Sequence, residues 1–541
     1  MKAVSRTRGP GTIGGVRVQW LVMVVFGACA TGGEQYRIRP DVRSMAGRDA
    51  FLARSLTPTK PRLNVVLIVA DDLGRTDTSM YPEGRVATPN LNALADQGVR
   101  YGAGYVTASL CSPSRAGLLT GRYQNRFGHE VQPHDRYVSN AFEYFFARMF
   151  MTTEDWKLLS YKAPDQEDVQ RQGIPRSEVL LPELLKRAGY ATGMFGKWHL
   201  GWNDDVQPHH RGFDEFVGFY EAYSLYASPI DRPDIVNQRL PEFSDRFIWE
   251  RGRSSISALT HNGKVIDEPG YLTDRFTDDA IAFIDQHQQE PFFVYLPYQN
   301  PHTPFQAKKT DFDAFPDEKD PIRRTYLALI RSLDTSVGRV MKALDERGLT
   351  NDTLVIVISD NGGALYTHAT SNSPFQGGKF TLFEGGVRVP FVMRWPAQLP
   401  AGARFDEPVS ALDVVATVAA AAGVPLPDDR VMDGVDLVPF VRGEKQGAPH
   451  EALFWRADYT SAIRKGPLKL IRDRHSDVTA LFDVVSDPGE TKDLTSTRPD
   501  DVKRLLGELD AWSAECATPL WPAVMDYRFV ASDGREYWYP L

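Results

Sequence analysis

The chain has 541 residues, a formal net charge of -8, and 42% apolar and 24% charged residues, a composition ordinary for a globular protein. This length exceeds what one small core can organise, so two or more folding units are expected. The acidic balance excludes a general binder of nucleic acids, and an anionic substrate would require a local basic pocket.

The N-terminal residues 1–30 have the pattern of an export signal. A basic region precedes the apolar run WLVMVVF (Trp20–Phe26), and a small-x-small cleavage pattern follows at Ala28–Ala30. The run is far shorter than the ~20 residues of a membrane span, so no transmembrane segment is expected. The alternatives are a buried helix or strand, or a lipoprotein anchor at Cys29. We expect an exported protein, periplasmic or secreted.

Residues 31–62 are polar and rich in arginine, and we expect a peripheral arm there. From Asn64 onward, apolar β-branched runs such as NVVLIVADD, PFFVYLPYQ and TLVIVIS alternate with amphipathic helical patterns. Such runs are typical of strands buried on both faces. The alternation predicts an α/β fold in which helices sandwich a large, mostly parallel or mixed sheet.

After about Gly443 the pattern changes to short strands at hairpin spacing, followed by the helical stretch DDVKRLLGELDAWSAE. We therefore expect a catalytic domain over residues 63–444 and a smaller α+β domain over residues 445–541.

Two of the expected strands end in polar pairs, Asp71-Asp72 and Asp360-Asn361. An Asp after a strand is usually a helix cap or turn, but ligands in open α/β sheets bind beyond the carboxyl ends of the strands. All four side chains offer oxygen ligands. They favour a hard cation, Ca²⁺ or Mg²⁺, over zinc.

Cys111 stands in the motif LCSPSRAGLLTGR (Leu110–Arg122), ahead of a leucine-rich stretch that predicts a helix. If Cys29 leaves with the signal, only Cys111 and Cys516 remain, and no disulfide framework beyond one long-range pair is possible. A free cysteine is commonly a small buried hydrophobe. At a helix N-terminus the dipole would instead favour the thiolate, which is a poor partner for a hard cation.

The motif CSPSRAGLLTGR resembles the sulfatase signature, C-x-P-x-R followed by L-x-T-G-R. The segments VADDLG, GKWHLG, NPHTPF, SDNGG and GGKFTLFEGGVRVPF stand around it in the order of that family. The resemblance covers roughly residues 62–525 and implies the fold of the alkaline phosphatase superfamily, with formylglycine-dependent, type I sulfatase chemistry.

The resemblance implies that Cys111 is a precursor, which a maturation enzyme oxidises to formylglycine. The hydrated aldehyde then carries two hydroxyls, of which one attacks the sulfur of a sulfate ester and the other later expels sulfate. By motif, the ligands of a calcium ion, with magnesium as the alternative, correspond to Asp71, Asp72, Asp360, Asn361 and residue 111.

The same motifs assign the remaining catalytic roles. Arg115 would steady the hydrate, and Lys197 and Lys379 would neutralise the sulfate oxygens. His199 would orient or deprotonate the diol, and His302 would protonate the leaving alcohol.

The segment Val138–Gln172 departs from the family pattern because it is long and rich in aromatic residues. It could cap the pocket, form a sugar-binding wall or contact another subunit. His129, Glu130 and His134, just upstream, are further candidates for substrate contact.

The function expected is hydrolysis of sulfate esters, most naturally on an extracellular sulfated carbohydrate. A formylglycine-dependent phosphodiesterase or phosphonate monoester hydrolase is the alternative, because sulfuryl and phosphoryl groups share tetrahedral geometry. A non-catalytic glycan-binding relative is a third possibility, which the complete set of catalytic residues argues against.

Overall fold

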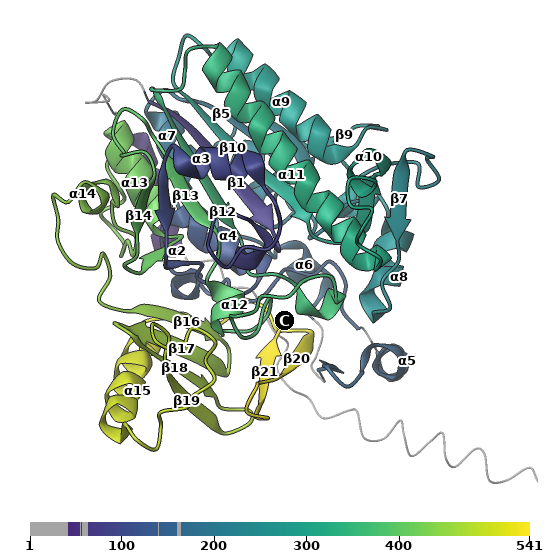
Figure 1. The fold of residues 1–541 in the computed structure, drawn as a ribbon, viewed down its shortest axis with the longest axis vertical. Coiled ribbons are helices and arrows are strands. Elements are labelled where there is room, and N and C mark those ends of the chain that lie inside the picture. Colours follow the sequence, from purple (N-terminus) through teal and green to yellow (C-terminus); the bar gives the residue numbers. More distant parts are fainter. Residues whose placement is uncertain (1–41, 55, 57–62, 139, 160–163) are drawn as a thin grey trace, which may run out of the picture.

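The computed structural model describes residues 42–54, 56, 63–138, 140–159 and 164–541 (Figure 1). The expected export signal and most of the expected arm lie outside the described residues. Within the arm, however, α2 (Val42–Ala53) is a helix, and Phe51 is buried in the core. This part of the arm contacts α7 (Leu181–Arg187), so it belongs to the fold and is not peripheral.

Ten strands form the central sheet in the order β14-β2-β13-β12-β1-β10-β5-β6-β8-β9. In that order their bounds are Ala403–Phe405, Val99–Tyr101, Phe391–Arg394, Thr353–Ser359, Asn64–Asp71, Phe292–Pro301, Ala191–Lys197, Glu215–Phe219, Thr260–His261 and Lys264–Val265. The five central strands from β12 to β6 pair in parallel, whereas β13 and β8 pair with them antiparallel. The mixed α/β sheet predicted from the sequence is confirmed.

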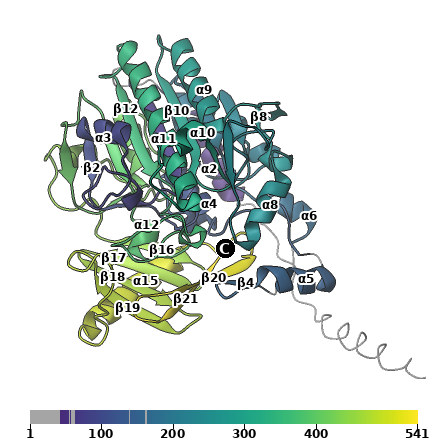
Figure 2. The same ribbon diagram turned by 45° about the vertical axis from the view of Figure 1, so that its right-hand side comes forward.

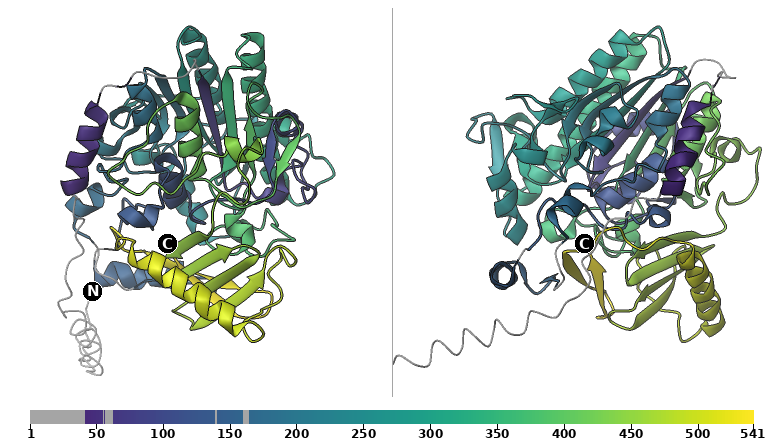
Figure 3. Two further views of the ribbon diagram at one scale, coloured as in Figure 1. Left: turned by 90° about the vertical axis from the view of Figure 1, so that its left-hand side faces the viewer. Right: turned by 180° about the vertical axis from the view of Figure 1, so that it is seen from behind.

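Helices cover both faces of this sheet (Figures 1 and 3). One face carries α3 (Pro89–Asp96), α9 (Leu272–Gln286) and α11 (Pro321–Glu346), and the other carries α4 (Cys111–Thr120), α7 and α13 (Asp413–Ala422). Successive side chains of a strand point to opposite faces, so Val66 and Ile68 enter one core while Val65 and Leu67 enter the other. Burial on both faces explains the uninterrupted apolar run.

A smaller C-terminal unit lies at one end of the large sheet (Figure 2). It is an antiparallel sheet of β16 (Leu453–Ala457), β17 (Thr460–Lys465), β18 (Leu468–Asp473) and β19 (Val478–Asp483), covered by α15 (Pro499–Ala514). Lys469 Nζ, fully buried, lies 3.0 Å from both Glu384 of α12 (Glu384–Val387) and Glu490. Removing one member of this buried group would leave an uncompensated charge, so it holds the two units in register.

The segment Val138–Gln172 contains α5 (Ala141–Met151), β4 (Trp156–Leu158) and α6 (Gln166–Gln170). β4 pairs with β20 (Met525–Val530), which pairs with β21 (Glu536–Pro540), so this segment is tied to the C-terminal residues. The remaining elements are β3 (Gly104–Tyr105), β7 (Ile235–Gln238), α8 (Phe243–Arg251), β11 (Phe305–Lys308), α10 (Lys309–Phe312), β15 (Val409–Ser410) and α14 (Val438–Val441), besides six short 3-10 turns. Within the described residues, no helix combines the length and apolar character needed to cross a bilayer.

Candidate active site

Four parallel strands deliver polar side chains to one edge of the sheet. Asp71 ends β1, Lys197 ends β5, Asp360 follows β12 and His302 follows β10. The pairings Ala70 with Ser359 and Asp71 with Pro301 place these ends side by side. The sheet therefore gathers residues that are far apart in the chain.

Helix α4 delivers Cys111 to the same place. Leu110 is extended and Cys111 is the first helical residue, while Gly121 ends the helix in the left-handed conformation with a φ of 68°. Gly tolerates this conformation without strain. Cys111 Sγ lies 3.4 Å from Asp71 Oδ1 and 3.9 Å from Asp72 Oδ1, and the thiol is fully buried.

The carboxylates of the site each have a cationic partner. Lys197 Nζ lies 2.5 Å from Asp71 Oδ2, and Lys379 Nζ lies 2.9 Å from Asp72 Oδ2. Arg115 Nε donates to Asp360 Oδ2 at 2.9 Å, and this is the third pair. The charges of three buried carboxylates and three cations cancel. A dication could therefore be added together with an anionic ligand without leaving a large net charge in the site.

These pairs set the ionisation of the site. Although burial opposes it, Lys197 holds the pKa of Asp71 below its ordinary value, and Lys379 does the same for Asp72. Burial and the neighbouring Asp71 raise the pKa of Asp360. Asp72 raises the pKa of Lys379 well above normal against the effect of burial, so this ammonium stays charged.

The arrangement could hold a metal ion. One ligand atom each of Asp71, Asp72, Cys111 and His302 lie within 4.8 Å of one another. Asn361 donates through Nδ2 to Asp72 Oδ1 at 2.8 Å, but its Oδ1 is buried and makes no hydrogen bond within the described structure. An unmet buried carbonyl is costly, and a cation beside the carboxylates would satisfy it.

Burial raises the pKa of the Cys111 thiol well above its ordinary value. The nearby Lys197 and Lys379 oppose this effect without overcoming it. This direction argues against a thiolate at the helix N-terminus for the unmodified side chain. A neutral buried thiol is a poor nucleophile as it stands.

Two histidines face this group. His199 has a φ of 58°, which is strained for a residue with a side chain, and its buried Nδ1 makes no hydrogen bond within the described structure. His302 Nδ1 lies 2.6 Å from the carbonyl of Thr303, which only accepts, so Nδ1 carries a proton and Nε2 is left to exchange one. Burial lowers the pKa of both histidines. The nearby Lys197 lowers the pKa of His199 further, and Lys379 does the same for His302.

The candidates upstream of the aromatic segment are largely structural. Glu130 is buried and bonds to Arg456 of the C-terminal unit, with Nε–Oε1 at 3.1 Å. His129 Nε2 lies 2.7 Å from Ser112 Oγ, and burial lowers the pKa of His129 to about 3. His134 is anchored through its backbone to Gln172.

Sequence reasoning missed a charged cluster beside the site. Arg251 Nη1 lies 2.9 Å from Asp135 and 3.0 Å from Glu221, which follows β6 next to Lys197. Burial raises the pKa of Glu221 to about 7. No local motif signals this cluster, because its members come from three distant segments.

Aromatic rings form a second wall, and one of them comes from the aromatic segment Val138–Gln172, for which a sugar-binding wall was one of the three roles considered from the sequence. Trp156 of β4 lies 5.4 Å from the ring of Phe380, the neighbour of Lys379, and Tyr366 stacks on Phe380 at 5.3 Å. Trp156 and Tyr366 are half-buried. The aromatic segment therefore reaches the wall of the site through β4, whereas α5 exposes Phe142, Phe145 and Phe150 at its outer side.

Family comparison gives two matches along the chain. The Sulfatase family model matches residues 63–424, and the model for the C-terminal region of N-sulphoglucosamine sulphohydrolase matches residues 378–510. N-acetylgalactosamine-6-sulfatase of Rattus norvegicus is 34% identical over 448 residues, which span 82% of this chain and 76% of that protein. Steryl-sulfatase of Homo sapiens is 30% identical over 476 residues, covering 77% and 76% respectively.

Solved structures show the same architecture. The crystal structure of Ps i-CgsB in complex with k-i-k-neocarrahexaose has a TM-score of 0.72 and 30% identity, and covers 85% of this chain and 95% of that one. A protein from a glycosaminoglycan-metabolism locus of Bacteroides thetaiotaomicron has a TM-score of 0.63 and 25% identity, with coverage of 84% and 100%.

Proposed function

The chain belongs to the sulfatase family and is a sulfuric ester hydrolase, and from that premise we propose that it desulfates an extracellular carbohydrate through a formylglycine at position 111 beside a calcium ion. The observation that carries this proposal is the position of Cys111 at the start of α4, neutral and buried against two carboxylates. Neither a disulfide nor a thiolate reaction accounts for that placement.

Oxidation of Cys111 to an aldehyde and its hydration replace sulfur by two oxygens. This chemistry removes the mismatch between a soft thiol and a site of oxygen ligands. One hydroxyl attacks the sulfur of the ester, and the S–O bond to the alcohol breaks. The second hydroxyl then loses its proton and expels sulfate, which restores the aldehyde.

Asp71, Asp72, Asp360 and Asn361 would hold the calcium ion, which supplies charge stabilisation and lowers the pKa of a nearby hydroxyl. Arg115 belongs to α4, one turn after Cys111, and its bonds to Asp360 and to the carbonyl of Lys197, both at 2.9 Å, would hold this end of the helix and steady residue 111.

Lys197 and Lys379 neutralise the sulfate oxygens. Their ammonium groups already face Asp71 and Asp72, so they are preorganised and need no rearrangement to receive charge. A dication held by the three carboxylates would give the site the net positive charge that an anionic substrate requires inside an otherwise acidic protein.

His302 donates the proton that the leaving alcohol needs, and His199 orients or deprotonates the diol. Burial and Lys379 lower the pKa of His302, so its imidazole is mainly neutral before substrate binds. An anionic sulfate ester beside it opposes the effect of Lys379 and raises that pKa toward the working range. The fixed proton on Nδ1 leaves Nε2 as the exchanging atom.

The walls of the site suit a sugar. Half-buried Trp156 and Tyr366 offer aromatic faces, and the cluster of Asp135, Glu221 and Arg251 offers donors and acceptors for hydroxyl groups. Carbohydrate sulfates are named for the similar N-acetylgalactosamine-6-sulfatase, and a carbohydrate is bound in the similar Ps i-CgsB structure. The proposal also includes export, which the N-terminal signal pattern supports, and a maturation enzyme that would oxidise Cys111.

A panel of sulfate and phosphate esters tests this function. We expect turnover of sulfated sugars and aryl sulfates to exceed that of phosphodiesters and phosphonate monoesters under equal conditions. Mass spectrometry of the peptide that contains residues 110–115 should show formylglycine in active protein. Preferred turnover of phosphate esters would overturn the substrate class, and an unmodified cysteine in fully active enzyme would overturn the mechanism.

A further inference from the structure

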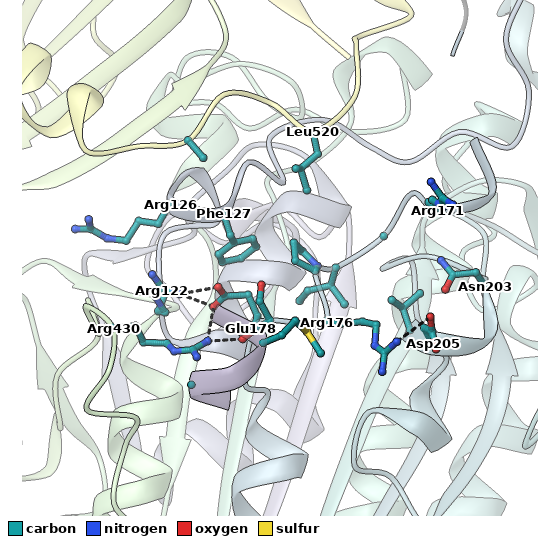
Figure 4. A pocket seen from close by; sticks show the side chains of 18 of the residues that line it. Arg122, Arg126, Phe127, Arg171, Arg176, Glu178, Asn203, Asp205, Arg430 and Leu520 are labelled. Carbon is teal, nitrogen blue, oxygen red and sulfur yellow. Dashed lines mark hydrogen bonds and ion pairs between the residues drawn. The ribbon is translucent and has the colours of Figure 1, made fainter. Parts of the chain in front are cut away.

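A cavity of about 890 Å³ lies apart from the reactive centre (Figure 4). Six stretches of the chain form it, from α2 near the N-terminus to the loop that follows α15. None of the residues assigned to catalysis or metal binding lines it. Arg122 lies in its wall at the far end of α4, so a ten-residue helix, or about 15 Å, separates the cavity from Cys111.

The cavity is basic in an acidic protein. Five arginines and three acidic residues line it, so the lining residues alone sum to +2 against -8 for the whole chain. Each of these arginines is paired with a carboxylate, and Arg126 and Arg171 pair with carboxylates outside the lining. Guanidinium groups match the geometry of sulfate and carboxylate, and each has more donors than one carboxylate can use.

The charges stand on two sides of the cavity. Figure 4 shows Arg122 and Arg430 together on one side, where Arg122 Nη1 lies 2.6 Å from Glu178 Oε2. Arg176 stands on the other side, 3.1 Å from Asp205 Oδ2.

Apolar surface separates these two basic groups. Phe127 and Leu520 lie between them, and Ile174 and Val206 also line the cavity. Anionic groups spaced along an oligosaccharide, with apolar sugar faces between them, match this pattern. A single small anion would use only one side.

The cavity wall is joined to the catalytic loop. Gly173 pairs with Gly201, two residues after His199, and Ile174 N donates to the carbonyl of Leu200 at 2.9 Å. A Cβ on Gly173 would come within 2.7 Å of the Leu200 oxygen, so the backbones touch. Binding in the cavity thus acts on a segment that carries a catalytic histidine.

We propose that this cavity is a second binding site for a sulfated oligosaccharide, which holds a distal part of a polymeric substrate while the reactive centre acts elsewhere. The proposal rests on the proposed function for its class of ligand. It adds a site that the chemistry of sulfate removal does not require. The volume of this cavity lies within the usual range for ligand-binding sites, about 300–1,000 Å³.

Titration calorimetry with a size-defined sulfated hexasaccharide tests the proposal on Cys111→Ala protein, which cannot turn it over. We expect two sites per chain, and one site after adding Arg176→Glu, or at least tenfold weaker binding at the second. Arg176 has a side chain that is 54% exposed, so its replacement should not impair folding. Arg504→Glu on α15, 45% exposed and outside the cavity lining, is the matched control and should retain two sites.

The chemically desulfated hexasaccharide should lose the second site, which separates recognition of anionic groups from recognition of sugar alone. In the background that retains Cys111, Arg176→Glu should raise KM for a long sulfated polymer and leave kcat/KM for an aryl sulfate unchanged. One site in the parent protein, or two unchanged sites in Arg176→Glu, would overturn the second site while leaving the proposed function intact. Failure to hydrolyse any sulfate ester would instead overturn the proposed function.

Discussion

Asn361→Ala should weaken the response of the protein to calcium. Its Oδ1 is buried and makes no hydrogen bond within the described structure, while its Nδ2 bonds to Asp72 at 2.8 Å. In the proposed site, this side chain would offer one neutral oxygen to the ion and would orient a carboxylate that offers another. Removing both effects should weaken binding of Ca²⁺ by at least tenfold, on the order of 1.4 kcal/mol.

The magnitude follows from linkage. A ligand at about 100 times its Kd stabilises the folded state by about 2.7 kcal/mol, and a tenfold weaker site loses about 1.4 kcal/mol of that at the same calcium concentration. Without metal, the variant loses the hydrogen bond to Asp72, which costs stability. It also loses the buried carbonyl oxygen that makes no hydrogen bond, and this removal offsets the cost. Its unfolding in EDTA should therefore differ little from that of the parent.

Thermal unfolding in EDTA, in excess Ca²⁺ and in excess Mg²⁺ measures how much each ion stabilises the folded state. The difference in Tm between the first two conditions should be clearly smaller for Asn361→Ala than for the parent. Asn125→Ala removes another buried asparagine, whose Nδ2 donates to the carbonyl of Arg456 at 3.0 Å, and should keep the parent's full calcium response. An equal calcium response in both variants, or none in the parent, would refute the assigned site.

Three further predictions concern charge, pH and substrate. Lys379→Ala should reduce kcat on an aryl sulfate about 10²–10³-fold, because it removes a preorganised cation; a change confined to KM would contradict that role. Glu221→Gln should stabilise the protein at pH 8 but not at pH 4. Burial raises the pKa of Glu221 from 4.5 to about 7, so between these values the folded state binds a proton that the unfolded state has released. The free energy of unfolding therefore falls by about 3 kcal/mol as the pH rises through this window, and glutamine, which does not ionise, avoids the loss. Tm measured at both pH values checks the sign, and Arg251 keeps Asp135 as a partner at 2.9 Å in the variant. Shortening the segment Val138–Gln172 by removing α5 should change KM on large glycans and spare a small aryl sulfate; equal losses on both would indicate a structural role.

The central sheet was predictable because its central strands are continuous apolar runs, which can be recognised from the local sequence alone. β1 is apolar from Val65 to Ala70 because neighbouring residues such as Val65 and Val66 enter opposite cores, and it ends at Asp71. The carboxyl ends of parallel strands meet at one edge, so the meeting of Asp71 and Asp360 also followed from local patterns. The resemblance to the sulfatases then located Lys197, His302 and Lys379 at that edge.

Other features depend on contacts between distant residues. β4 pairs with β20, so Leu158 lies opposite Met525, and no local pattern specifies such a partner. Complete burial raises the pKa of the Cys111 thiol, and the local sequence around the helix start does not reveal that burial. The buried Phe51 of α2 was missed because the surrounding residues 31–62 are mostly polar.

The most direct measurement of the central claim is intact-protein mass spectrometry of Cys111→Ser after incubation with an aryl sulfate. Serine offers one oxygen near the position of Sγ, so attack on sulfur proceeds slowly, but it lacks the second hydroxyl that expels sulfate. We predict a stable sulfo-serine adduct at residue 111 and at most about one turnover, with neither adduct nor turnover for Cys111→Ala. Sustained multiple turnover by Cys111→Ser would contradict release of sulfate by the hydrate of formylglycine.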